Sequence, residues 1–315
     1  MKTPHTCVYL DSHLADYNFG IDHPFGPQRH QAFEQAFHAR QLDGLTDILS
    51  ARQAAPEALL TFHTRACIEK IIQLSRTGQG YLDQGDTPAF RGMYEVVLYI
   101  AGSVLDAVDR LMRCEYRSAF VPIAGLHHAR RDRAAGFCII NDCGLAIEHL
   151  LNTYNLERIA YIDIDAHHGD GVFYSFEKEP RLIFADIHED GQYLYPGTGR
   201  ATETGRGRAT GCKLNIPMPP EADDAAFLQV WQQLESFIDE RRPEFIILQC
   251  GADSLQADPI THLAYSQKAH AHAARRLRQI ADKHCAGKLL ALGGGGYNLD
   301  NIGRAWSAVV EALAA

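Results

Sequence analysis

Residues 159–172 read IAYIDIDAHHGDGV, and the expected fold and site are both organised around them. The first half alternates apolar and acidic residues, which is the period-two pattern of a β-strand, and the glycine-rich second half is typical of a loop. Side chains two positions apart share one face of a strand, so Asp163 and Asp165 should project together at its carboxyl end. His167, two positions further on, should lie on the same side. Because carboxylates on a buried strand are costly without a partner, Asp165 and His167 are interpreted as metal ligands. The structural alternative is a hydrogen-bonded aspartate at a polar strand exit.

The composition is that of an acidic protein with a large apolar fraction. The chain has 315 residues, of which 46% are apolar, and a net charge of −9 without a long basic stripe. Nucleic acid and anionic membranes are therefore poor candidate partners. The 8 cysteines are scattered without a Cys-x-x-Cys pair, which argues against a disulfide framework or a zinc knuckle. Residues 1–5 lack the apolar run of a signal peptide and no stretch reaches transmembrane length, so we expect a protein of the reducing cytoplasm.

Apolar strands alternate with longer helical segments along the chain. This alternation predicts an α/β fold with a mostly parallel sheet that helices cover on both faces. No repeat or composition break divides the sequence, so we expect a single domain over residues 1–315. The polar segment 200–211 is expected to be a mobile surface connection. Besides the strand that begins at 159, strands are expected at 6–10, 118–123, 181–188, 245–250 and 288–292, and helices at 30–42, 65–76, 93–112, 141–152, 223–241, 266–284 and 301–313.

The unusual polar clusters each follow one of the expected strands. In open parallel sheets, ligands bind outside the carboxyl ends of the strands, so these clusters should converge on one site. Asp253 follows the strand 245–250 and is the best candidate for a third ligand, which would complete the three-ligand set of a catalytic zinc site. Its structural alternative is a helix N-cap or turn aspartate.

Two histidines and a tyrosine are candidate catalytic groups. A carboxylate behind an imidazole fixes its tautomer and raises its basicity, so we pair His127 with Asp163 and His128 with Asp170. Tyr297 follows four glycines, and its phenol can donate a hydrogen bond to a developing oxyanion. A phosphate-binding loop is the alternative for these glycines, but the lysine and hydroxyl residue of such a motif do not follow them.

Phe137 and Tyr195 lie in glycine-bearing loops beside these polar clusters. Paired aromatic side chains would form the walls of a narrow apolar tunnel that suits an alkyl chain. Ordinary core aromatic residues are the structural alternative for both positions.

Together these motifs closely resemble the zinc-dependent histone deacetylase family, which includes acetoin-utilisation-type and polyamine deacetylases of bacteria. The resemblance runs in order from the loop at 17–29 to the C-terminal helix, and the compact length is typical of bacterial members. The motifs are GLHHA at 125–129, GFC at 136–138, DIDAHHGDG at 163–171, PGTG at 196–199, QCGADSL at 249–255 and GGGGY at 293–297.

The resemblance implies an arginase/deacetylase-type fold with a central sheet of about eight strands. It implies that Asp165, His167 and Asp253 hold Zn²⁺, and Fe²⁺ is a second candidate for the same ligands. The implied catalytic residues are His127, His128, Asp163, Asp170 and Tyr297. The implied substrate-binding residues are Asp86 at the rim, Phe137 and Tyr195 in the tunnel wall, and Gly136, Gly295 and Ile260 beside them.

Two further positions follow from the resemblance. Arg29 matches an arginine of the inner acetate-exit cavity. A potassium site near Asp163 is expected, although Asp186 stands where a potassium-coordinating serine is common. One departure concerns the tunnel, because Tyr195 stands where phenylalanine is usual and makes the wall slightly more polar.

The resulting hypothesis is hydrolysis of an N-acyl amide on a flexible amine chain, most simply ε-N-acetyl-lysine in a peptide or protein. An acetylated polyamine or a lactyl-lysine is the alternative substrate. Asp22, Asp83 and Asp86 would attract a cationic substrate, unless they are only solvated charges at the rim. An arginase-like two-metal hydrolase and a catalytically silent acyl-lysine binder are the alternatives from other classes.

Overall fold

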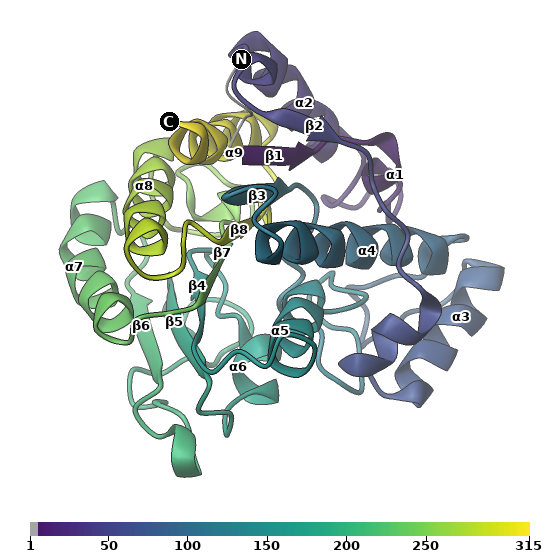
Figure 1. The fold of residues 1–315 in the computed structure, drawn as a ribbon. Helices are drawn as coiled ribbons and strands as arrows, with labels where there is room; N and C mark the ends of the chain where they lie inside the picture. Colours follow the sequence, from purple (N-terminus) through teal and green to yellow (C-terminus); the bar gives the residue numbers. More distant parts are fainter. Residues whose placement is uncertain (1–5) are drawn as a thin grey trace.

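The computed structural model describes residues 6–315, so the expected absence of a signal peptide in residues 1–5 falls outside it. Its centre is one sheet of 8 parallel strands in the order β2-β1-β3-β8-β7-β4-β5-β6 (Figure 1). The α/β class and the strand number expected from the sequence are confirmed. The strands are β1 (Thr6–Tyr9), β2 (Asp47–Leu49), β3 (Ser118–Val121), β4 (Ile159–Asp163), β5 (Leu182–Glu189), β6 (Lys213–Met218), β7 (Phe245–Gln249) and β8 (Leu289–Leu292).

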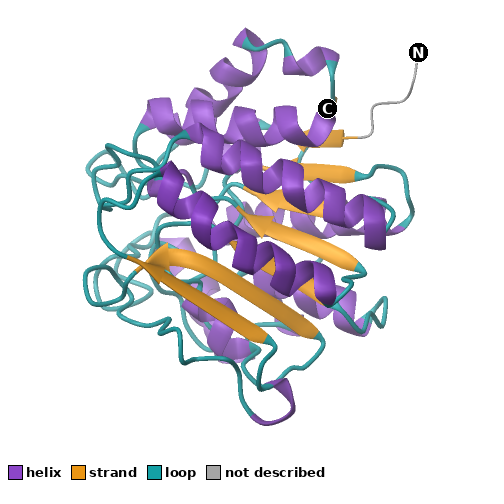
Figure 2. Ribbon diagram, turned by 90° about the vertical axis from the view of Figure 1, so that its left-hand side faces the viewer, coloured by secondary structure: helices purple, strands orange, loops and turns teal. Residues whose placement is uncertain are grey.

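Helices cover both faces of this sheet. They are α1 (Ser12–Ala15), α2 (Gln28–Ala39), α3 (Arg65–Thr77), α4 (Met93–Met112), α5 (Asp142–Asn152), α6 (Asp170–Ser175), α7 (Asp224–Glu240), α8 (Gln267–His284) and α9 (Leu299–Ala314). Helices α2, α9, α8 and α7 pack side by side on one face, and α4, α5 and α6 pack on the other, which gives the three layers seen in Figures 1 and 2. Among residues 6–315, no helix combines the length and apolar character needed to cross a membrane.

Strand β4 shows why the sheet forms where it does. All five of its residues are buried, since β5 and β7 flank it and helices cover both of its faces. A strand buried on both sides reads as a nearly continuous apolar run, and here the run ends at Asp163. Asp163 lies opposite Asp186 of β5 and Gln249 of β7, so polar chemistry begins at the carboxyl end of three adjacent strands.

The two edge strands were not predicted from the sequence. Strand β2 has only three residues, none of them buried, so it carries no apolar run. Strand β6 interrupts its apolar residues with Lys213, Asn215 and Pro217. Proline cannot donate to a sheet ladder and is tolerated on an edge strand, where β6 lies. The short helix α6 was also missed, because the glycine-rich motif around it reads as a loop.

The connection at residues 200–211 is more ordered in its contacts than its polar sequence suggests. It contains a short 3₁₀ turn at Gly207–Ala209. One carboxylate oxygen of Glu203 accepts hydrogen bonds from the backbone N–H groups of Gly199 (3.1 Å) and Arg200 (2.8 Å), and the other accepts from the hydroxyl of Tyr174 (2.6 Å). The segment is therefore a surface connection, as expected, but one that Glu203 ties to neighbouring elements.

Candidate metal centre and catalytic pocket

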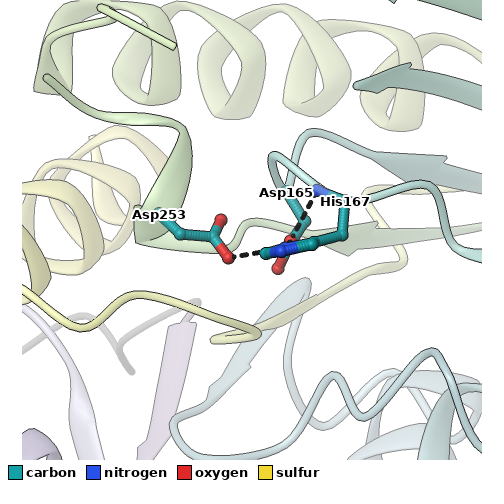
Figure 3. A group of neighbouring side chains, drawn as sticks. All are labelled: Asp165, His167 and Asp253. Carbon is teal, nitrogen blue, oxygen red and sulfur yellow. Dashed lines mark hydrogen bonds and ion pairs between the residues drawn. The ribbon is translucent and has the colours of Figure 1, made fainter. Parts of the chain in front are cut away.

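Asp165, His167 and Asp253 come together in one buried cluster (Figure 3). One potential ligand atom from each residue lies within 4.8 Å of the other two. His167 Nδ1 is 3.0 Å from a carboxylate oxygen of Asp165 and 3.1 Å from one of Asp253. The relative exposures of the three residues are 1%, 8% and 0%, so the cluster is nearly sealed from solvent. The structure thus brings together the three side chains that the sequence singled out as ligands.

Adjacent strands position these three side chains. Asp165 and His167 follow β4, and Asp253 lies in a 3₁₀ turn (Ala252–Ser254) that follows β7, the direct neighbour of β4. The backbone N–H of Ala166 donates to Asp253 (3.0 Å). The side-chain amide of Gln249 donates to Asp165 (2.9 Å) and so fixes the orientation of this carboxylate. Gln249 is a positioning residue that sequence reasoning missed, since a glutamine at the end of an apolar strand gives no metal-site signal.

The electrostatics of the cluster suit a cation. Burial raises the pKa of Asp253 to about 7, and the carboxylate of Asp165 acts in the same direction. Burial opposes a charge on His167, but its hydrogen bonds with Asp165 and Asp253 raise its pKa to about 10. Two buried carboxylates whose candidate ligand atoms lie within 4.8 Å of each other need a positive charge between them. Two carboxylate oxygens and one imidazole nitrogen form a donor set that fits Zn²⁺, and Fe²⁺ accepts the same set.

The two adjacent histidines are paired with the two expected aspartates. His127 Nδ1 lies 2.8 Å from Asp163, and His128 Nδ1 lies 2.7 Å from Asp170. The Nε2 atoms of the two rings are 3.1 Å apart. Burial opposes a charge on His127, but the carboxylates of Asp163 and Asp165 raise its pKa to about 10. Burial, followed by the charge of His127, lowers the pKa of His128 to about 4.

The backbone that carries these histidines is held from helix α5. The carboxylate of Asp142 accepts hydrogen bonds from the backbone N–H groups of Gly125 and Leu126, both at 2.7 Å. Asn141, the N-cap of α5, donates its side-chain amide to the carbonyl of Ala129 at 2.7 Å. Sequence reasoning did not select either residue, because an Asn-Asp pair at a helix start reads as an ordinary cap. Asn141 and Asp142 are positioning residues for the histidine pair.

A cavity of about 300 Å³ leads to the metal ligands and the histidine pair. Its wall includes every residue that the sequence assigned to substrate binding, together with Tyr297. The ring of Phe137 meets the ring of Tyr297 edge-on, with centroids 5.8 Å apart. The assigned lining residues are Asp86, Gly136, Phe137, Tyr195, Ile260 and Gly295.

The tunnel wall carries a strained residue. Phe137 has φ of 65°, a left-handed conformation that is uncommon for a bulky side chain. The Tyr17 hydroxyl donates to the carbonyl of Phe137 (2.6 Å) and accepts from the N–H of Ile139 (2.9 Å). The hydroxyl of Thr87 accepts from the N–H of Phe137 (3.1 Å). Two distant segments, those of Tyr17 and Thr87, therefore hold Phe137 against the cavity, which is the pattern expected where strain serves a site.

Gly136 precedes this strained residue and needs to be a glycine. Its φ is 54°, and a Cβ atom here would lie 2.6 Å from the ring of His128. Any side chain would therefore displace the catalytic-pair histidine or close the cavity.

Tyr297 lies in the same cavity and is fixed through its backbone. Its N–H donates to the carboxylate of Asp258 at 2.8 Å, a contact that the sequence gave no reason to expect. Burial raises the pKa of the Tyr297 phenol well above its usual range, so the hydroxyl keeps its proton. The cavity wall that contains the three candidate metal ligands therefore also contains a protonated phenol, which is a hydrogen-bond donor.

Arg29 lies behind the glycine loop and does not line this cavity. Its guanidinium donates to the carbonyls of Gly296 (2.7 Å) and Gly294 (2.6 Å), and its third nitrogen, Nη1, has no partner among the described residues. The ring of Phe25 lies 3.9 Å from the guanidinium carbon. These contacts give Arg29 a role in supporting the loop before Tyr297, and the acetate-exit role remains a prediction.

The expected potassium site is also untested. Asp186 accepts a hydrogen bond from the N–H of Gly169 (2.8 Å), and its other oxygen lies 2.7 Å from Nδ1 of His188. Asp163 accepts from the hydroxyl of Tyr161 (2.7 Å) besides its contact with His127. A monovalent ion near Asp163 therefore stays a prediction from the sequence.

Comparisons with known proteins agree with this fold and indicate the family. The Histone deacetylase domain model matches residues 23–313. The acetoin utilization protein AcuC of Bacillus subtilis (strain 168) is 36% identical over 96% of this chain and 80% of its own length. Histone deacetylase B of Dictyostelium discoideum is 32% identical over 96% of this chain and 72% of its own length. The crystal structure of the HDA15 HD domain has a TM-score of 0.90 at 24% identity, over 98% of this chain and 88% of that one, which shows the shared fold.

The chain has the arginase/deacetylase fold with a three-residue candidate metal centre, and the family model and relatives that it matches indicate a hydrolase. The chain belongs to the histone deacetylase family.

Proposed function

We propose that this protein is a zinc-dependent deacylase that removes an acyl group, most simply acetyl, from the ε-amine of lysine in a peptide or protein. One observation carries the proposal: three candidate ligands, an aspartate-backed histidine pair and a protonated tyrosine face a single cavity of about 300 Å³. Bound Zn²⁺ would supply a Lewis acid and an activated water. The residues of the chain supply the proton transfers, the orientation and the enclosure.

The two histidines have different roles in proton transfer. His127, whose pKa is raised to about 10, carries a proton on both ring nitrogens: Nδ1 donates to Asp163, and Nε2 lies 3.1 Å from Nε2 of His128. His128, whose pKa is lowered to about 4, is neutral at pH 7 and holds its own proton on Nδ1 against Asp170. Nε2 of His128 is therefore the basic nitrogen that takes the proton of the attacking water and returns it to the leaving amine. His127 remains charged and stabilises the negative charge that develops beside it.

Tyr297 and the cavity walls orient the substrate. The Tyr297 hydroxyl donates to the oxyanion as the amide carbon becomes tetrahedral. The cavity between Phe137 and Tyr195 suits an unbranched alkyl chain, which excludes water from the reacting amide. Asp86 at the rim accepts hydrogen bonds from the substrate backbone.

A panel of acyl substrates on metal-reconstituted protein tests the proposal. The panel contains an acetyl-lysine peptide, a lactyl-lysine peptide, acetylputrescine and free arginine, with a hydroxamate inhibitor as the control. We expect the highest kcat/KM for the acetyl-lysine peptide, and we expect the hydroxamate to abolish this hydrolysis. Fastest turnover of acetylputrescine or of the lactyl peptide would move the substrate to that alternative. Turnover of arginine alone, or of nothing in the panel, would contradict the proposal. A single domain over residues 1–315 and a cytoplasmic location remain predictions.

A further inference from the structure

A second groove opens beside the mouth of the catalytic cavity. Its volume is about 660 Å³, and it shares Asp86 and Tyr195 with the cavity. Lys70 of α3 and Arg133 line its remaining wall. Because the two spaces share wall residues, a chain that leaves the cavity at Asp86 passes directly into the groove.

Two cationic side chains in the wall of this groove, Lys70 and Arg133, are exposed. The ammonium of Lys70 donates to the carbonyl of Leu82 (2.7 Å) and forms no ion pair within residues 6–315. Arg133 pairs only with its sequence neighbour Asp132, at 3.0 Å, and both side chains are more than half exposed. Both cationic groups are therefore available to a carboxylate from outside.

Two acidic side chains, Asp83 and Asp86, also line the groove: Asp86 lies at the rim that it shares with the cavity, and Asp83 is engaged within its own loop. The carboxylate of Asp83 accepts the backbone N–H groups of Gly85 (3.0 Å), Asp86 (3.2 Å) and Thr87 (3.0 Å), and it also accepts the hydroxyl of Thr87. These four hydrogen bonds hold the charged carboxylate of Asp83 within its own loop. The sequence had suggested Asp83 as an attractor for a cationic substrate, but these contacts leave it little capacity for that role.

We propose that this groove binds the polypeptide segment flanking the acyl-lysine and selects an acidic side chain in that segment through Arg133 and Lys70. The inference rests on the proposed deacylase function and specifies its substrate class. A free acylated polyamine has a second amine in place of such a segment and offers no carboxylate to Arg133 and Lys70. The groove therefore favours a peptide or protein substrate over a small polyamine.

The test measures kcat/KM for matched acetyl-lysine peptides that carry Glu, Gln or Lys at each position from three before to three after the acetyl-lysine. For the wild-type protein we expect Glu to exceed Lys by about threefold to tenfold at one or more of these positions, the worth of one or two exposed ion pairs. Arg133→Glu should reverse this preference. Lys70→Gln, which keeps a donor for Leu82, should reduce it.

Two controls separate charge from general damage. Arg208→Glu makes the same charge change at an exposed arginine in the 3₁₀ turn after β5, outside the groove, and should leave the preference unchanged. A blocked single acetyl-lysine does not reach the groove and should react equally with all variants. Equal kcat/KM for the Glu and Lys peptides, or the same reversal in Arg208→Glu, would overturn the inference alone. No hydrolysis of the blocked acetyl-lysine by wild-type protein would overturn the proposed function and this inference with it.

Discussion

Both adjacent histidines are buried, but the carboxylates of Asp163 and Asp165 raise the pKa of His127, whereas burial and the charge of His127 lower the pKa of His128. Asp163 is fully buried and is not paired with a lysine or arginine among the described residues, so His127 is its positive partner. Asp170 also receives the guanidinium of Arg130 at 2.8 Å, which already neutralises it. Asp170 can therefore orient the ring of His128 through Nδ1 while Nε2 of His128 stays unprotonated.

Removing the Tyr297 hydroxyl tests its role as an oxyanion donor. Tyr297→Phe keeps the ring and its edge-on contact with Phe137 but removes the donor. We expect kcat to fall by roughly 10²–10³, the usual worth of one such donor. Tyr193→Phe, at an exposed tyrosine of a nearby loop, is the matched control and should be neutral. Unchanged kcat in the Tyr297 variant would remove this residue from the mechanism.

Asp86 gives substrate binding a pH dependence. Burial and the hydrogen bond with Asp83 raise the pKa of Asp86 to about 6, whereas hydrogen bonds outweigh burial and lower the pKa of Asp83 to about 2. Asp86 is therefore protonated below pH 6 and becomes a charged acceptor above it. KM for a peptide substrate should fall as the pH rises from 5 to 7. The ratio of KM for Asp86→Asn to KM for wild type should rise over the same range, and a constant ratio would rule out Asp86 as the group that titrates.

For individual residues, the sequence predicted the two histidine–aspartate pairs, but it predicted neither the backbone strain of Phe137 nor the residues that position the site. The pairing of His127 with Asp163 and of His128 with Asp170 was predicted because a carboxylate fixes the tautomer of an imidazole, and the structure contains both contacts. The positive φ of Phe137 gave no sequence signal, because backbone strain depends on contacts with Tyr17 and Thr87, which come from distant segments.

At the level of secondary-structure elements, the glycine loop after β8 brings its backbone into contact with the candidate metal ligands. The N–H of Gly295 donates to Asp165 at 2.9 Å. A Cβ atom at this position would clash with a carboxylate oxygen of Asp253 and would lie 2.9 Å from one of Asp165. The loop therefore approaches two candidate ligands as closely as only a glycine permits, and Arg29 supports it from behind.

Gly295→Ala tests this close approach. The added methyl group should push Asp253 or Asp165 out of place and lower metal affinity, on the order of 10–100-fold as for other disturbed supporting residues. Gly44→Ala is the matched control, because a Cβ atom at Gly44 has no atom within 4 Å. The measurement is metal content after dialysis against a weak chelator. Wild-type metal retention by the Gly295 variant would show that the loop is not constrained by the ligands.

The elements themselves were predicted best where burial is greatest. Strands β4, β7 and β8 are apolar runs that end in polar motifs, so both their type and the convergence of their carboxyl ends followed from the sequence. The edge strands β2 and β6 were missed, because an edge strand is defined by its neighbour and not by its own apolar pattern.

In the whole molecule, the sheet concentrates negative charge at one end. Asp163, Asp165, Asp186 and Asp253 are all buried at the carboxyl ends of β4, β5 and β7. Histidine partners neutralise this cluster only in part, so a bound cation should contribute to the stability of the entire fold.

Removing the metal should therefore lower the melting temperature. A ligand at 100 to 1,000 times its Kd stabilises a protein by about 3–4 kcal/mol, which corresponds to a shift of roughly 5–15 °C for a chain of this size. Calorimetry before and after treatment with a strong chelator measures the shift, and added Zn²⁺ should restore the original value. An unchanged melting temperature despite complete removal of the metal would contradict this coupling.

The central claim is that Asp165, His167 and Asp253 bind one catalytic metal ion, and metal stoichiometry tests it most directly. Elemental analysis of zinc-reconstituted protein should find one ion per chain, and Asp253→Asn should lose it while keeping its circular dichroism spectrum. Asp224→Asn, a change at an aspartate that bonds Ser266 away from the cavity, should keep its ion. Two ions per chain, or a full complement of metal in the Asp253 variant, would contradict the account.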